Sequence, residues 1–320
     1  MIEIDGSYGE GGGQIVRSSL ALSAITSIPI KIINIRAGRE KPGLRPQHLT
    51  AVNSVRKVCR GTLEGAEVGS KELVFTPGKI VGGKYSLDIG TAGSTILVAQ
   101  TIIPILFTAD KKSRVKITGG THVMKSPCYD YFENVFLPAI RLMDAKIESR
   151  MIKPGFYPKG GGQVELEIEP SKIKGNSEWP EESEIHSIIR LSNLPLSIAM
   201  REKKILLNNG IEDVKIREEK TFSPGNAITV YSGLKGSYSL GKIGKRAETV
   251  AQEAVDELKT ETGNVDRYLA DQLLIYAAMA EGETSFSTSK ITEHFKTNSE
   301  VIKKFHKRKI ETGENSVRVI

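Results

Sequence analysis

The chain has 320 residues, of which 39% are hydrophobic and 26% are charged, a balance typical of soluble globular proteins. This composition excludes a disordered, collagen-like or coiled-coil protein, and the length suffices for two domains or for one large domain with an insertion. The 45 Lys and Arg residues against 38 Asp and Glu residues give a net charge of +7, which fits either a solvated basic surface or a polyanionic partner such as a nucleotide or nucleic acid.

Two cysteines, Cys59 and Cys128, are too few for a disulfide scaffold or a Cys-rich zinc module, so a reducing, cytoplasmic compartment is expected. The first residues lack the basic and apolar regions of a signal peptide. The most apolar segment, 96–107, contains Gln100 and Pro104 and is too short to span a bilayer. We therefore expect a soluble protein that makes no membrane contact.

Hydrophobic periodicity predicts the same order of elements, β-α-β-α-β-β, twice in succession. The first unit has a strand at 2–5, helices at 14–26 and 47–59, and strands at 30–35, 63–68 and 71–76. The second unit has strands at 85–89, 114–118, 145–151 and 163–168 and helices at 94–107 and 129–143.

A third copy near the C-terminus lacks its local first strand. It comprises helices at 266–281 and 298–305 and strands at 283–287, 307–311 and 316–320. Before it, the region that begins with an acidic, Pro-containing stretch near 178–184 has strands near 185–191, 214–217 and 227–232 and helices near 197–208 and 245–259. We predict an α/β (α+β) fold of three βαβαββ units, with a large domain at 1–179 and 264–320 and a smaller α/β domain inserted at 180–263.

The sequence Gly-Glu-Gly-Gly-Gly-Gln at 9–14 follows a strand and begins a helix, where backbone N–H groups and the helix dipole can bind an anion. It is neither a Walker A loop nor a dinucleotide fingerprint, because the Lys-Ser/Thr pair and the final glycine are missing. A tight turn that needs positive φ is the alternative. A related string, Tyr-Pro-Lys-Gly-Gly-Gly-Gln-Val at 157–164, precedes a strand, so turn chemistry alone can explain it.

The loop at 36–48 presents Arg36, Arg39 and Arg45 among two Pro and two Gly residues. Guanidinium groups bind phosphates in a bidentate manner, so the loop is either a phosphate cradle or a solvated basic loop. A second basic cluster lies at 303–309.

None of the five histidines has the spacing of a metal site, so a structural zinc is not expected. His294 lies just before a capping-box-like Thr297-x-x-Glu300 pattern, which predicts a loop position ahead of a helix. A neutral imidazole can act as a nucleophile without an auxiliary base, although an exposed loop histidine often has no role. Asp271, near the start of its helix, is either a helix-dipole partner or a ligand for a hard cation beside phosphates.

Several strings, taken together and in chain order, resemble the RNA 3′-terminal phosphate cyclase family. They are the 9–14 motif with Arg17, the 36–48 loop, Gly-Thr-Ala-Gly-Ser at 90–94 with Gln100, Gly-Gly-Thr at 119–121, the 157–162 motif, Leu-Ala-Asp-Gln at 269–272, and His294-x-x-Thr297-Asn298. The resemblance runs from the first residues to the last helix, and the family fold has three such units with an insertion before the third. The residues around Thr292, Arg45 and His122 depart from the commoner family forms, which leaves end-sequence preference and nucleotide discrimination open.

The resemblance implies ATP-dependent conversion of an RNA 3′-phosphate to a 2′,3′-cyclic phosphate, through a histidinyl–AMP adduct and an adenylated RNA end. It implies ATP as co-substrate, Mg²⁺ or Mn²⁺ as cation and a 3′-phosphorylated RNA as partner, and it leaves a homodimer open. Residue by residue, it implies His294 as nucleophile; Gln100, Tyr268, Leu269, Ala270, Asp271 and Gln272 as ATP contacts; Arg17, Arg39, Gln47 and His48 as phosphate contacts; and Glu10 and Asp271 as metal ligands.

Two other classes compete with this hypothesis. Cyclase-like ribosome-assembly proteins keep the fold but lack the nucleophilic histidine, whereas His294 is present here. Enolpyruvyl transferases repeat the same βαβαββ unit, but they need more units than a chain of this length supplies.

Overall fold

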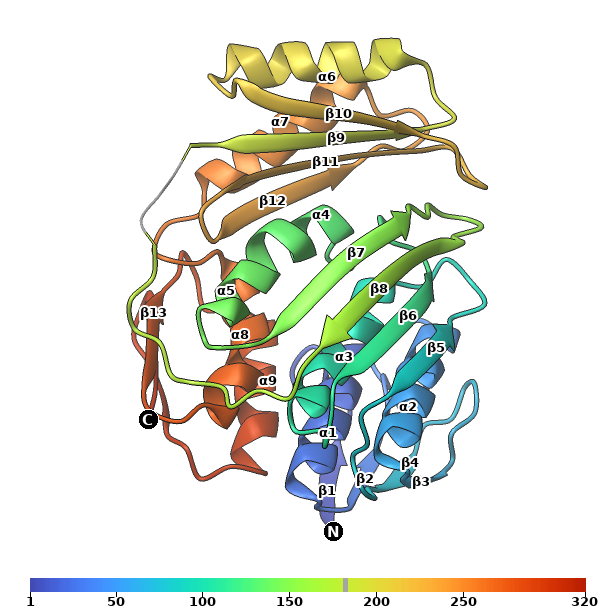
Figure 1. Cartoon of the computed structure of the whole chain (residues 1–320), viewed down its shortest axis with the longest axis vertical. Coiled ribbons are helices and arrows are strands. Elements are labelled where there is room, and N and C mark those ends of the chain that lie inside the picture. The colour runs from blue at the N-terminus through green and yellow to red at the C-terminus, as the bar shows by residue number, and fades with distance from the viewer. Residues whose placement is uncertain (181–183) are drawn as a thin grey trace.

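The computed structural model describes residues 1–180 and 184–320, in which helices and strands are interspersed along the chain (Figure 1). This mixed architecture confirms the predicted α/β (α+β) fold class. The residues at 181–183, part of the predicted acidic stretch, lie outside the described residues. Within the described residues, no helix combines the length and apolar character needed to cross a bilayer.

The first unit builds a four-stranded sheet with the order β1-β2-β4-β3, in which only the β1–β2 pair is parallel. Helices α1 and α2 pack against each other and against this sheet, because their apolar stripes of Ile15, Leu20, Val52 and Val55 are buried. The elements are β1 (Ile2–Asp5), α1 (Gly13–Thr26), β2 (Ile30–Ile33), α2 (Pro46–Cys59), β3 (Thr62–Glu64) and β4 (Leu73–Thr76).

The second unit repeats that sheet order as β5-β6-β8-β7. Its second helix is broken by a π-helical segment, where the N–H of Leu137 bonds to the carbonyl of Phe132. Pro138 follows immediately and cannot donate the usual helical hydrogen bond, which accounts for the widened turn. The elements are β5 (Lys84–Asp88), α3 (Thr95–Phe107), β6 (Ser113–Gly119), α4 (Tyr129–Tyr131), η1 (Phe132–Phe136), α5 (Leu137–Arg141), β7 (Ile147–Lys153) and β8 (Gly162–Ile168).

The C-terminal elements form a three-stranded sheet with the order β13-β15-β14, which matches the last three positions of the other two sheets. The predicted start of the last helix at Asn298 is wrong. The helix begins at Glu293, capped by the hydroxyl of Thr292, because Phe295 in its first turn is 99% buried. The elements are α8 (Arg267–Met279), β13 (Thr284–Ser287), α9 (Glu293–Lys303), β14 (Ile310–Thr312) and β15 (Ser316–Val319).

The region between these units forms its own sheet, β10-β9-β11-β12, with α6 and α7 on one face and a separate hydrophobic core (Figure 1). Strand β12 was not predicted, because Lys-Gly-Ser-Tyr-Ser-Leu carries almost no large apolar side chains. The domain boundaries at 180 and 263 stay a prediction. The elements are β9 (His186–Ser192), α6 (Leu196–Asn208), β10 (Asp213–Glu219), β11 (Gly225–Ser232), β12 (Lys235–Leu240) and α7 (Ala247–Lys259).

Buried charges join this region to the second unit. The carboxylate of Asp130 accepts from the Arg190 guanidinium at 2.6 and 2.8 Å and lies 3.0 Å from Nε2 of His122. Asp266, the N-cap of α8, accepts from the Tyr131 hydroxyl at 2.9 Å and from the Gly236 amide at 3.0 Å. Removing Arg190 would leave the Asp130 carboxylate as an uncompensated buried charge, and removing the Tyr131 hydroxyl would cost Asp266 a buried hydrogen bond, so these contacts hold the two parts in one arrangement.

Candidate functional site

The N-terminus of α1 is open to an anion. Its N-cap is Gly12, which offers no side-chain acceptor, and its first turn contains no acidic residue. The preceding loop depends on Gly9 and Gly11, whose φ angles are +56° and +53°. The free N–H groups of this turn therefore point out of the helix without a side-chain cap, as in anion-binding helix ends.

Glycine also allows two distant segments to approach this loop. A Cβ atom on Gly9 would lie 2.2 Å from Oγ1 of Thr297 in α9, and one on Gly13 would lie 2.2 Å from Nε2 of His48 in α2. The motif thus brings α1, α2 and the last helix together at one point.

Gln14 connects the predicted nucleophile to α8. Its amide nitrogen donates to both carboxylate oxygens of Asp271, at 2.6 and 2.7 Å, and its amide oxygen lies 2.6 Å from Nδ1 of His294. A carboxylate only accepts hydrogen bonds, so Asp271 fixes the amide with its oxygen toward the histidine. Nδ1 of His294 must then carry the proton, which leaves Nε2 as the ring atom available for chemistry.

Nε2 of His294 faces the carboxylate of Glu10 at 2.9 Å, an ion-pair distance when the ring is protonated. The side chain of His294 is 46% exposed, and the guanidinium of Arg39 lies 3.7 Å from the same Glu10 oxygen. The site therefore combines a solvent-accessible imidazole with a carboxylate and a cation.

Arg17 lies one turn after Gln14 on α1 and has no hydrogen-bonding or ion-pair partner within residues 1–180 and 184–320. Burial lowers the pKa of its guanidinium to about 10, and the nearby Asp271 carboxylate opposes that shift. The group stays charged at neutral pH. A partly desolvated guanidinium without an anion is a strong site for phosphate.

His48 is a neutral donor at the same point. Its Nδ1 accepts from the backbone N–H of Arg45 at 3.2 Å, so the proton of the neutral ring lies on Nε2, beside Gly13. Burial, followed by repulsion from Arg17 and two other arginines, lowers its pKa to about 3. The side-chain oxygen of Gln47 accepts from the backbone N–H of Ser94 at 3.0 Å, which joins α2 to the loop before α3.

The predicted ATP contacts on α8 divide into two faces. Leu269 and Ala270 are buried in the core, so only their backbone is available to a ligand. Gln272 donates to the carbonyl of Tyr268 at 3.0 Å and accepts from Gln100 of α3, which ties the two helices together.

Burial raises the pKa of Asp271, although His294, Gln14, Asn298 and Arg17 all oppose that shift.

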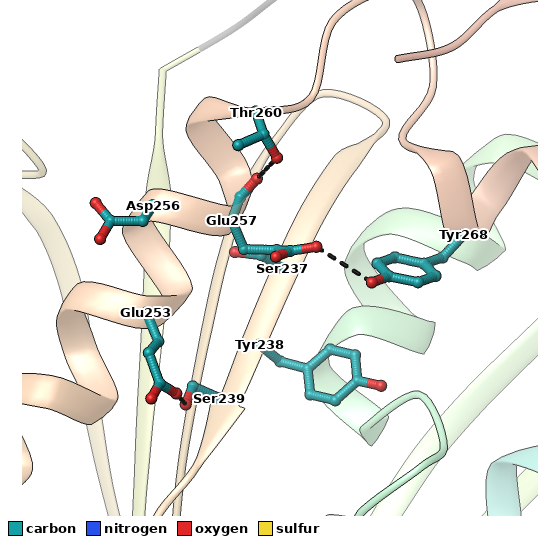
Figure 2. A pocket seen from close by; sticks show the side chains of 8 residues that line it. All are labelled: Ser237, Tyr238, Ser239, Glu253, Asp256, Glu257, Thr260 and Tyr268. Atoms are coloured by element: carbon teal, nitrogen blue, oxygen red, sulfur yellow. Dashed lines mark hydrogen bonds between the residues drawn. The ribbon is translucent and has the colours of Figure 1, made fainter. Parts of the chain in front are cut away.

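The ring of Tyr268 is 46% exposed and borders a cavity of about 530 Å³ between α7, β12 and the start of α8 (Figure 2). Its hydroxyl donates to Glu257 at 3.2 Å. The lining also contains Glu253 and Asp256, so the cavity is acidic and rich in hydrogen-bond acceptors. It suits an uncharged ring with amino donors and disfavours a phosphate.

Of the two predicted metal ligands, Glu10 is better placed than Asp271 to bind a divalent cation. In the part of the chain that the structure describes, no three His, Cys, Asp or Glu side chains converge on a common metal position. Both oxygens of Asp271 already accept from Gln14, whereas Glu10 is partly exposed. Magnesium sites that bind nucleotides commonly use one or two carboxylates together with phosphate oxygens, and Glu10 fits that pattern better than Asp271.

The C-terminal basic cluster is mostly structural. The Arg308 guanidinium donates to the carbonyls of Ala277, Ala280 and Gly282 and thereby caps the end of α8. Lys303 pairs with Glu300 at 2.6 Å. The cluster therefore gives less support to nucleic-acid binding than its sequence suggests.

Two residues of the site were not predicted to have a role in it. Gln14 was noted only as the end of the glycine motif, and Asn298 only as part of the His294 string. The side-chain nitrogen of Asn298 donates to the Asp271 carbonyl at 3.2 Å, while its buried oxygen has no partner among the described residues. The position of Gln14 immediately after three glycines, at a helix start, was the signal in the sequence.

Comparison with known proteins gives a consistent result. A family model described as RNA 3′-terminal phosphate cyclase matches residues 8–312. Curated proteins named RNA 3′-terminal phosphate cyclase from Archaeoglobus fulgidus and Methanococcoides burtonii are 44% and 43% identical to this chain. The first alignment covers 95% of both proteins, and the second covers 100% of this chain and 99% of the relative.

Among solved structures, the enolpyruvyl transferase NikO from Streptomyces tendae aligns with 99% of this chain and 47% of its own length. The sequence identity is 9% and the TM-score is 0.44, a similarity too low to support a conclusion about function.

Proposed function

Because this chain belongs to the RNA 3′-terminal phosphate cyclase family, we propose that it converts an RNA 3′-phosphate to a 2′,3′-cyclic phosphate at the expense of ATP, through a covalent adduct on His294. The observation that carries the proposal is the Asp271–Gln14–His294 chain of hydrogen bonds beside Arg17, whose guanidinium has no ion-pair partner among the described residues. This arrangement fixes a nucleophilic nitrogen next to a binding site for phosphate.

In the first step, Nε2 of His294 attacks the α-phosphorus of ATP, a P–N bond forms, and pyrophosphate leaves. Attack requires that Nε2 carry no proton, any proton there passing to the Glu10 carboxylate or to solvent, and that Glu10 then move aside, because the lone pair must point at phosphorus. As the ring becomes positively charged, its Nδ1–H bond to the Gln14 oxygen strengthens and stabilises the transition state more than the ground state. Arg17 and the N-terminus of α1 stabilise the phosphate charge.

In the second step, an oxygen of the RNA 3′-phosphate attacks the same phosphorus and displaces the histidine, which gives an RNA end joined to AMP by a diphosphate. The adjacent ribose 2′-hydroxyl then attacks the RNA phosphorus, loses its proton and expels AMP. That last step is intramolecular, so proximity lowers its barrier. It also requires RNA at the terminal nucleotide, because the 2′-hydroxyl is a reactant.

The phosphate contacts proposed are Arg17, Arg39, Gln47 and His48, and the adenine is proposed to stack on Tyr268. Tyr268 and Asp271 are three residues apart on α8, so their Cα atoms are separated by about 4.5 Å along the helix axis. The acidic cavity beside Tyr268 offers acceptors for the amino group of a base. A Mg²⁺ or Mn²⁺ ion held by Glu10 and the phosphate oxygens would neutralise charge on the triphosphate.

The decisive experiment is incubation of the protein with ATP labelled at the α-phosphate. We expect acid-labile label on the wild-type chain, no label on His294→Ala, and conversion of a 3′-phosphorylated RNA to a cyclic end only by the wild type. His186→Ala is the matched control, because His186 is also partly exposed and has a carboxylate, Asp213, 2.6 Å from its ring. An unlabelled wild-type chain, or a fully labelled His294→Ala, would refute the proposal and favour a non-catalytic relative.

The cytoplasmic location and a homodimer remain proposals. Both Cys59 and Cys128 are buried free thiols, which is consistent with a reducing compartment.

A further inference from the structure

Two exposed aromatic rings stand on two turns that belong to different sheets and touch each other. Tyr157, in the turn between β7 and β8, is 75% exposed, and Phe222, between β10 and β11, is 63% exposed. A Cβ atom on Gly161 of the first turn would lie 2.5 Å from the Phe222 ring, so the two turns are in direct contact. A single exposed ring is common on protein surfaces, but two of them on touching turns form a larger apolar area of the kind found at binding sites.

The surroundings of these rings are basic. The ammonium group of Lys153 lies 4.9 Å from the centre of the Phe222 ring. Lys159 and Lys220, both exposed, have no acidic partner within the described residues. We call Tyr157, Phe222, Lys153 and Lys159 the aromatic platform; it combines stacking surfaces with unneutralised positive charge.

The platform is held in place. The backbone N–H of Lys159 donates to the buried Ser223 hydroxyl at 3.1 Å, and Ser192 and Thr221 support that same turn through a 2.8 Å hydrogen bond. A Cβ atom on Gly225 would overlap the Phe156 ring at 2.1 Å. The backbone of both turns is therefore fixed, and binding has to order only the platform side chains, which favours affinity.

A continuous line of contacts leads from the platform to the proposed active site. Gly160, next to Gly161, packs on Ala92, where a Cβ atom would lie 2.8 Å from the Ala92 Cα. Ala92 lies in the loop between β5 and α3, and Ser94 of that loop donates its backbone N–H to the side-chain oxygen of Gln47. Gln47 precedes His48, which lies against Gly13 at the start of α1. The platform and the proposed active site are therefore linked by segments that touch one another.

We propose that the aromatic platform binds the unpaired nucleotides upstream of the RNA 3′ end, with bases on Tyr157 and Phe222 and phosphates beside Lys153 and Lys159. This inference rests on the proposed function for the position of the 3′ end. Stacking on aromatic rings is independent of sequence, because every base has a π-face. Lysines contact only the phosphates of the backbone. The platform thus selects single-stranded ends and not a particular sequence.

The test compares the binding of two 3′-phosphorylated RNA oligonucleotides, a dinucleotide and an octanucleotide of about the span of one single-strand binding module. We expect the wild type to favour the longer RNA. Tyr157→Ala and Phe222→Ala should each weaken octanucleotide binding by about 5- to 150-fold, the usual loss for one stacked base, with little change for the dinucleotide. Phe222→Trp should keep the affinity, and Leu207→Ala, an exposed apolar residue on α6, is the control.

A salt titration separates stacking from charge. Lys159→Ala should reduce the slope of log affinity against log salt by about 0.7, the value for one phosphate of a single strand. If only the lysine substitution weakens octanucleotide binding, or if the ring variants keep the wild-type preference for length, the stacking platform is refuted.

Labelling of the protein by ATP needs no RNA. It therefore distinguishes failure of the platform proposal from failure of the proposed function. If the wild-type protein is labelled by ATP and cyclises both RNAs, but binds the dinucleotide and the octanucleotide with equal affinity, only the platform is refuted. If the wild-type protein is never labelled, yet the ring variants bind the octanucleotide more weakly than the wild type does, the cyclase chemistry is refuted and the platform is supported.

Discussion

Replacing Gln14 by Leu tests whether the amide positions the nucleophile or merely fills space. The substitution keeps nearly the same volume but removes the donor to Asp271, at 2.6 and 2.7 Å, and the acceptor for Nδ1 of His294, at 2.6 Å. The bond to Nδ1 becomes charge-assisted as the imidazole attacks phosphorus, and such bonds contribute about 1.5–3 kcal/mol. We therefore expect protein adenylation to slow by about 10- to 150-fold.

The effect should fall on the rate constant and not on ATP affinity, because the bond strengthens only in the transition state. The assay is single-turnover formation of the acid-labile AMP adduct across a range of ATP concentrations, with thermal unfolding measured in parallel. Gln252→Leu is the matched control, since Gln252 on α7 likewise donates to an aspartate, Asp256, at 2.7 Å and accepts from Asn209. A Gln14→Leu rate within about threefold of wild type, or an equal loss in Gln252→Leu, would contradict the reasoning.

Two further predictions concern charge. Arg17→Met should lower ATP-dependent labelling by about tenfold or more without lowering the melting temperature, because the partly buried guanidinium has no partner in the part of the chain that the structure describes. Lys307→Met should change labelling little, and equal losses in both variants would indicate diffuse electrostatics. Burial raises the pKa of Glu202 from its ordinary 4.5 to about 7, so the folded state holds a proton there that the unfolded state releases, and stability is lost as the pH rises from about 4.5 to 7. Glu202→Gln should thus be more stable than wild type by roughly 3 kcal/mol at pH 8 and by much less at pH 5, as measured by denaturant unfolding; a difference independent of pH would argue against this titration.

Periodicity in the sequence was sufficient for most of the elements. The prediction for 2–5 coincides with β1, and those for 14–26 and 47–59 differ from α1 and α2 by one residue, because each carries a regular apolar stripe. Strand β12 had no such signal. Its buried side chains include Ser237 and Ser239, which pack under α7, and the strand forms because β11 offers it a pairing edge. Pairing of this kind is decided by tertiary contacts and not by local pattern.

The start of α9 shows a different limit. Both Thr292 and Thr297 are good capping residues, and local rules favoured the second because Glu300 follows it. In the structure Thr292 caps the helix, Phe295 fills the core, and the Thr297 hydroxyl donates to the carbonyl of Glu293. The difference bears on function, because it moves His294 from a loop into the first turn of a helix, where its ring direction is fixed.

The sequence identified the participants of the site but not their connections. His294 and the glycine motif could be singled out separately, whereas the bond between Gln14 and His294 joins residues 280 positions apart. No periodicity predicts that contact. Only the packing of α1 against α9, and of α8 against α9, brings them together.

That packing gives two glycines of the motif a role in addition to the anion-binding turn. Gly13 has no positive φ that would demand glycine, yet a Cβ atom there would displace His48. On Gly9 a Cβ atom would displace Thr297 and, with it, the helical turn that carries His294. Since phosphate transfer is sensitive to displacements of about 1 Å, these glycines serve the chemistry by setting distances between units of the fold, in addition to exposing backbone N–H groups.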